Sequence, residues 1–132
     1  MQPKTLQMTD IDKQITYWLN GATDDLVSAK ILIDNNRLLH GLFLCHLVIE
    51  KSLKAIVVRE TNEIAPRSHN LLYLSELAKL SFEEGDEIFL GILMKYQLQG
   101  RYPDYNPTVP NPDKTREYLY KTEKLMTWLQ TK

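Results

Sequence analysis

Apolar residues recur every three or four positions along the first quarter of the chain, with polar residues between them. This spacing follows the 3.6-residue period of an α-helix, so it predicts one long amphipathic helix over residues 10–35. Thr9 and Asp12 resemble a capping box and predict its start. Gly21 lies inside this helix at a cost of about 1 kcal/mol relative to alanine, so we expect a close helix contact there. The apolar stripe consists of Ile11, Ile15, Trp18, Ala22, Leu26, Ala29 and Ile33.

The second predicted helix, residues 38–59, is apolar on nearly every side through the run LFLCHLVI at residues 42–49. A helix of that kind lies in the middle of a bundle or in an interface between subunits. Its second half is amphipathic, with polar side chains such as Glu50 and Lys54. We expect a loop over residues 60–68 to follow it.

Leucines at every third position from residue 71 to residue 77 predict a short third helix. Ser68 is a candidate N-cap for it. The pair His69-Asn70 also stands at its start, where a side chain could satisfy a free backbone group, and we favour this interpretation over catalysis.

Two longer helices complete the chain. Ser81 and Glu84 form a second capping-box pattern that predicts the start of a fourth helix, and Gly100 stands where such helices end. Asn111 followed by Pro112 predicts a cap and the first residue of the last helix.

No segment combines β-branched enrichment with alternating polarity, so we expect no strands. The sequence therefore predicts an all-α fold, an up-and-down bundle of four long helices plus one short helix. A chain of 132 residues fits a single domain over residues 1–132. Its 43% hydrophobic and 25% charged residues are typical of globular proteins.

The net charge of −1 gives no general attraction to nucleic acid or to a membrane, so we expect neither DNA nor a membrane as a partner. Contact with RNA or a nucleotide would have to come from a local patch. The apolar run at residues 42–49 is too short to span a bilayer. Cys45 is the single cysteine, which excludes an internal disulfide and favours a reducing compartment, so we expect a cytoplasmic protein.

The sequence carries no Gly-rich phosphate loop, no paired cysteines and no Gly-x-Ser-x-Gly elbow. Its histidines are His40, His46 and His69. The first two are six residues apart and therefore face different sides of their helix. We expect no metal site and no cofactor.

His46, Glu50 and Lys54 are spaced by four residues and share one face of the second helix. In the functional interpretation, this polar face lines a cleft and the carboxylate shifts the pKa of the histidine. The structural interpretation is a ladder of charges along a helix, which we favour from spacing alone. Against it, His46 lies within an apolar run, where an ionisable group needs a partner.

Four of the six prolines fall within the segment QLQGRYPDYNPTVPNP at residues 97–112. Arg101, Tyr102 and Asp104 stand at its front, and a guanidinium beside aromatic rings suits a phosphate or a base. Alternatively, Arg101 caps the carbonyls of the fourth helix and the prolines stiffen a connection. Long loops without regular structure are often functional, and the two interpretations remain balanced.

Four segments resemble HEPN domains, the higher-eukaryote and prokaryote nucleotide-binding family. LFLCHLVIEKSLKAIV (42–57) is similar to the family's second helix, and SHNLLYL (68–74) to its His-Asn-Leu stretch. GRYPDY (100–105) resembles the Arg-Tyr-Pro motif of one prokaryotic branch, and WLNGATDDLVSAKIL (18–32) the first helix. The four occur in the family's order and cover about residues 10–130.

The resemblance implies a helical homodimer that is often encoded beside a minimal nucleotidyltransferase, as a module of toxin–antitoxin type. Many such domains are metal-independent ribonucleases, in which an arginine is followed four to six residues later by a histidine. Here Asn106 stands five residues after Arg101, and no histidine follows His69. Because asparagine cannot transfer a proton at neutral pH, the nuclease pair is incomplete.

The leading hypothesis is therefore a module that binds a nucleotide, RNA or a protein partner. Arg101 is the candidate phosphate contact, and we expect Glu50 to pair with it. The other candidate ligand-binding residues are Tyr102, Asp104, Asn106, Glu50 and Lys54. The alternative is a ribonuclease toxin in which Arg101 works with His46 or Tyr102. A third interpretation is a module that only dimerises and docks a partner through its apolar second helix.

Overall fold

The computed structural model describes residues 8–102 and 108–132, which form five α-helices. They are α1 (Met8–Asp34), α2 (Leu38–Thr61), α3 (Leu71–Leu77), α4 (Glu84–Arg101) and α5 (Pro112–Leu129). No strand occurs within these residues. The predicted all-α bundle of four long helices and one short one is confirmed.

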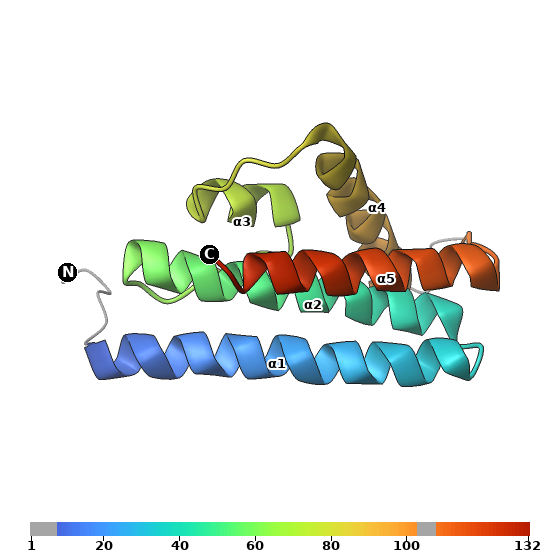
Figure 1. Ribbon diagram of the computed structural model, residues 1–132, viewed down its shortest axis with the longest axis horizontal. Coiled ribbons are helices and arrows are strands. Elements are labelled where there is room, and N and C mark those ends of the chain that lie inside the picture. Colours follow the sequence, from blue (N-terminus) through green and yellow to red (C-terminus); the bar gives the residue numbers. More distant parts are fainter. Residues whose placement is uncertain (1–7, 103–107) are drawn as a thin grey trace.

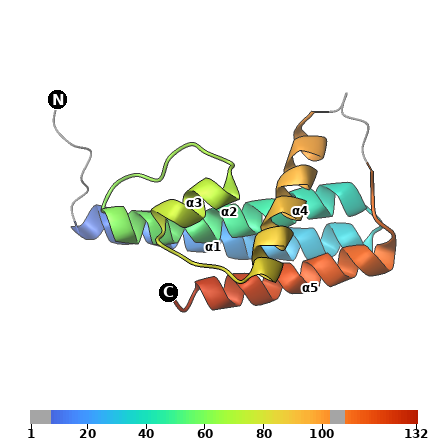
Figure 2. The same cartoon turned by 90° about the horizontal axis from the view of Figure 1, so that it is seen from above.

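The helix α2 lies at the centre of the molecule and contacts every other helix. Figure 1 shows α1, α2 and α5 side by side along the long axis, with α3 and α4 on the far side of α2 from α1. Figure 2 shows that α4 runs across these helices rather than along them. The nearly all-round apolar character of the run at residues 42–49 explains this central place, because each side of the helix meets another element.

The turn between α1 and α2 brings the two helices into close contact. Asn36 has a positive φ of 61° in this turn, a conformation that asparagine tolerates better than most residues. Gly41 follows in the first turn of α2 and is buried. A Cβ atom at Gly41 would clash with Cγ1 of Ile33, so only glycine allows α2 to pack this tightly against α1.

Two asparagines cap helices. Oδ1 of Asn70 accepts hydrogen bonds from the backbone nitrogens of Leu72 and Tyr73, at 3.0 and 3.1 Å. The cap of α3 is therefore Asn70 and not Ser68, whose hydroxyl accepts from the backbone nitrogen of Asn70. Oδ1 of Asn111 accepts from the backbone nitrogen of Lys114 at 2.8 Å, which confirms the predicted start of α5.

Three predicted helix ends were wrong. Thr9 lies inside α1 and so is not its N-cap. The extended residue before α4 is Glu83, without a side-chain cap bond, and Ser81 lies two residues further back. Gly100 lies inside α4, which continues to Arg101. Capping motifs recur by chance in polar segments, and the packing of the helix against its neighbours decides which residue ends it.

Within the part of the chain that the structure describes, no helix is both long and apolar enough to cross a bilayer.

Candidate functional site

One stripe of α2 carries both aromatic and ionisable side chains. Phe43, His46, Glu50 and Lys54 follow each other at intervals of three and four residues, so they lie on one face of the helix. This stripe meets the segment that precedes α3 and the last turn of α4. The candidate site is built around it.

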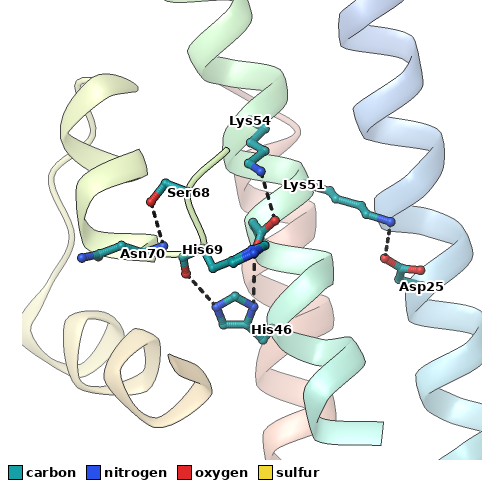
Figure 3. A network of polar contacts seen from close by, with 8 residues as sticks. Asp25, His46, Lys51, Lys54, Ser68, His69 and Asn70 are labelled. Atoms are coloured by element: carbon teal, nitrogen blue, oxygen red, sulfur yellow. Dashed lines mark hydrogen bonds and ion pairs between the residues drawn. The ribbon is translucent and has the colours of Figure 1, made fainter. Parts of the chain in front are cut away.

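The centre of the site is the carboxylate of Glu50, of which only 3% is exposed. Its Oε1 lies 2.8 Å from Nδ1 of His69, and its Oε2 accepts a hydrogen bond from Nζ of Lys54 at 3.1 Å. Nδ1 of His46 lies 3.6 Å from Oε1. We call Glu50, Lys54, His46 and His69 the Glu50 cluster (Figure 3). A buried carboxylate needs donors such as Lys54 and His69, since desolvation without them would cost several kcal/mol.

His46 is fully buried, and its Nε2 lies 3.0 Å from the backbone carbonyl oxygen of His69. Since a carbonyl can only accept, Nε2 carries the hydrogen and donates it. The pKa of His46 is lowered from its ordinary 6.5 to about 4, mainly by burial; the charges of His69 and Arg101 act in the same direction, and Glu50 and the backbone hydrogen bond oppose them. His46 is therefore neutral at pH 7 and has no access to solvent.

His69 is the accessible histidine of the cluster, with 42% of its side chain exposed. Its Nδ1 donates to Glu50, which fixes the tautomer and leaves Nε2 as the second ring nitrogen. The sequence interpretation of the His69-Asn70 pair was a helix cap, and Asn70 alone fills that role. Glu50 and His69 are 19 positions apart with a loop between them, so no helical spacing could have identified this pair.

Arg101 is the last residue of α4, and its side chain is exposed. Its guanidinium carbon lies 5.8 Å from the centre of the Phe43 ring, within the range of a cation–π contact. Its effect on the pKa of His46 places its charge near the Glu50 cluster. Among the described residues, however, the Glu50 carboxylate is engaged by Lys54 and His69, so the expected Glu50–Arg101 pair was wrong within one chain.

The other predicted ligand-binding residues are divided between the surface, the interior and the undescribed segment. Tyr102 follows α4 and is 54% exposed. Lys54 is 5% exposed, and its ammonium group lies 5.1 Å from the centre of the Trp18 ring. Asp104 and Asn106 lie outside the described residues. The structure thus brings Arg101 and Tyr102 to the surface and keeps Lys54 inside.

On the α1 side of α2, Lys51 pairs with Asp25 at 2.7 Å (Figure 3). The side chain of Lys51 crosses Gly21, where a Cβ atom would lie 3.1 Å from Cδ of Lys51. The close contact predicted at Gly21 is therefore confirmed, with a lysine side chain as its partner. Within the described residues, no three His, Cys, Asp or Glu side chains are grouped so that they could hold a metal ion.

A groove of about 630 Å³ lies elsewhere, between the start of α4 and the end of α5. Its walls include Phe82, Phe89 and Trp128, flanked by exposed residues such as Asp86 and Lys121. No member of the Glu50 cluster lines it. We place the candidate site at the Glu50 cluster because ionisable groups are buried and mutually oriented there, which is typical of functional sites.

The fold and the cluster define a class of protein: an all-α bundle whose central helix carries a buried acid–base cluster beside an exposed arginine. The family model for the HEPN domain matches residues 15–132. The chain belongs to the HEPN domain family. Neither the curated proteins nor the solved structures contain a significant match to it.

Proposed function

We propose that this HEPN domain binds the phosphate groups of a nucleotide or of RNA at the surface formed by α2 and the end of α4. The observation that carries the proposal is Arg101, whose exposed guanidinium lies over Phe43 at the end of a helix. A guanidinium in a defined position can bind a phosphate through two parallel hydrogen bonds. Tyr102 lies next to it as a surface on which a base could stack.

The proposal extends to assembly. We expect a cytoplasmic homodimer that works with a minimal nucleotidyltransferase, as a module of toxin–antitoxin type. Membership of the HEPN family supports this, as do two exposed apolar side chains near Arg101, Leu98 at 42% and Tyr102 at 54% exposure. Leu98 in the last turn of α4 and Tyr102 directly after it offer apolar surface to a second copy.

Calorimetric titration of the purified protein with ATP, GTP and a short RNA tests the binding. We expect Arg101→Ala to weaken binding by about tenfold or more, as loss of a charged hydrogen bond does. Lys124→Ala is the matched control, because it removes an exposed positive charge from α5. If the wild-type protein binds none of the three ligands, the nucleotide part of the proposal fails.

The alternative function, a metal-independent ribonuclease, requires a proton-transfer group that the substrate can reach. His46 is buried and neutral, which counts against it in that role. His69 is exposed and held by a carboxylate, and this single observation keeps the alternative open. Incubation of total RNA with the protein in a chelating buffer tests it. Cleavage that disappears in Arg101→Ala would replace binding by catalysis as the function.

A further inference from the structure

The imidazole of His69 is held in a defined orientation at the surface. Its Nδ1 is bonded to a carboxylate that is itself almost fully buried, at 2.8 Å, while 42% of the side chain remains exposed. Burial and the bond to Lys54 fix the position of that carboxylate in turn. An exposed side chain that is oriented by a buried one loses little freedom when it binds a ligand.

The imidazole of His69 serves Glu50 with one of its two nitrogens only. The backbone carbonyl of His69 is bonded by His46, and the start of α3 is capped by Asn70. Glu50 has a counter-charge in Lys54 at 3.1 Å, and Nδ1 of His69 donates to its other oxygen. Nε2 takes no part in these contacts, so it is the nitrogen that a ligand could use.

Arg101 and His69 lie above the same stripe of α2. The guanidinium of Arg101 is over Phe43, and the ring of His69 is on Glu50, seven residues further along the helix. At a rise of 1.5 Å per residue, positions 43 and 50 are about 10 Å apart along the axis of α2. A ligand with two or more phosphates is long enough to contact side chains above both positions.

The charges on this face favour an anion. Among the described residues, the charged and titratable groups that contact His69 or act on its neighbour His46 are Glu50, Lys54 and Arg101. Glu50 and Lys54 neutralise each other, and His46 is neutral at pH 7. Among the described residues of this group, Arg101 is then the positive charge without a carboxylate partner.

We propose that Arg101 and His69 form a two-point site for a ligand with at least two phosphate groups, and that Glu50 positions His69 in it. With a proton on each ring nitrogen, His69 donates from Nδ1 to Glu50 and from Nε2 to one phosphate, and the guanidinium of Arg101 contacts another. This inference rests on the proposed binding function and specifies its ligand chemistry. An RNA strand and a nucleoside triphosphate both supply that chemistry.

His69→Asn is the informative variant, because an asparagine amide can take the place of Nδ1 on Glu50 but has nothing in the place of Nε2. Binding of ATP, AMP and a short RNA without a 5′ triphosphate is measured for the wild type, His69→Asn, Arg101→Ala and the double variant. Thermal unfolding of each variant shows whether the fold is retained.

For a ligand that spans the site, we expect each single variant to lose about tenfold in affinity and the double variant about a hundredfold. AMP has one phosphate, so it should lose affinity in only one of the two single variants. If the variants lose affinity for RNA only, the ligand is an RNA strand. If they lose affinity for ATP only, the ligand is a nucleoside triphosphate.

Unchanged binding of both RNA and ATP in His69→Asn, together with a loss in Arg101→Ala, would overturn the two-point site and leave the proposed function intact. Equal losses for AMP in both single variants would also overturn it, because one phosphate would then touch both residues. If the wild type binds none of the ligands, both proposals fall together.

Glu50→Gln tests the positioning role, since glutamine can still accept from His69 but carries no charge. A neutral amide holds the imidazole less firmly than a carboxylate, so we expect His69→Asn to cost less affinity in the Glu50→Gln background than in the wild type. An equal cost in both backgrounds would remove Glu50 from the proposal.

Discussion

The two sides of α2 use the same kinds of charged side chain for different purposes. On the α1 side, Lys51 is paired with Asp25 and crosses Gly21, so its charge is matched and its chain is packed. On the side of α3 and α4, His69 and Arg101 are oriented by α2 but keep part of their surface in solvent. Charges that are neutralised inside a protein serve its stability, whereas oriented and exposed ones are available to a ligand.

On the side of α3 and α4, Glu50 contacts both Lys54 and His69. Its removal should have the largest effect on stability. Glu50→Ala leaves the ammonium of Lys54 buried without its carboxylate and releases His69. Loss of one partner of a buried pair typically costs 3–5 kcal/mol, so we expect about that loss in the free energy of unfolding. Unfolding in urea measures it, and a change below about 1 kcal/mol would mean that the cluster is not a structural pair.

The neutral state of His46 makes stability depend on pH. Its pKa is about 4 in the folded protein and 6.5 ordinarily, so in the range between the unfolded chain binds a proton that the folded one excludes. Stability is therefore complete above the ordinary pKa and is lost as the pH falls toward 4, by roughly 3 kcal/mol in all.

Urea unfolding of the wild type and of His46→Gln at several pH values checks this expectation. Glutamine can still donate to the carbonyl of His69 but does not titrate, so the variant should have a flatter profile below pH 6.5. The expectation fails if both proteins lose stability equally.

The Lys51–Asp25 pair should contribute less, because 26% and 18% of the two side chains are exposed. Lys51→Ala removes the ion pair and the packing over Gly21, and we expect a loss of about 1 kcal/mol in the free energy of unfolding. A double-mutant cycle with Asp25→Ala separates the two contributions. A coupling energy near zero would assign the loss to packing alone.

Arg101→Ala should have the smallest effect on stability, within about 0.5 kcal/mol, because its side chain is exposed. The same variant should lose ligand affinity. A large loss of binding with a small loss of stability is what we expect of a residue on the side of α2 that faces α3 and α4. Urea unfolding beside calorimetric titration measures both. A destabilisation of 2 kcal/mol or more would assign Arg101 a structural role like that of Lys51.

Much of the fold could be predicted from local patterns. The helical period and the capping patterns together identified every helix, and the all-round apolar run placed α2 at the centre of the bundle. Asn111 followed by Pro112 marked the start of α5 because a cap needs only neighbouring residues. Ser81 and Gly100 fit equally local rules and were wrong, because helix α4 begins and ends where its packing allows.

The candidate site was less predictable. Spacing along one helix correctly grouped His46, Glu50 and Lys54, since residues four apart share a face. The expected partner of Glu50 was Arg101, whereas the structure places His69 there. His69 reaches Glu50 through the course of a loop, and neither its residue type nor its spacing reveals that contact.

The amino-acid order was sufficient for the helices and for which of their faces are apolar, because both depend on interactions within a few residues. The crossing of α4 over α2 and the path of the loop before α3 depend on how side chains from distant segments fill a common interior. Those two features alone decide that Glu50 holds His69, that His46 is sealed from solvent and that Arg101 lies exposed beside them.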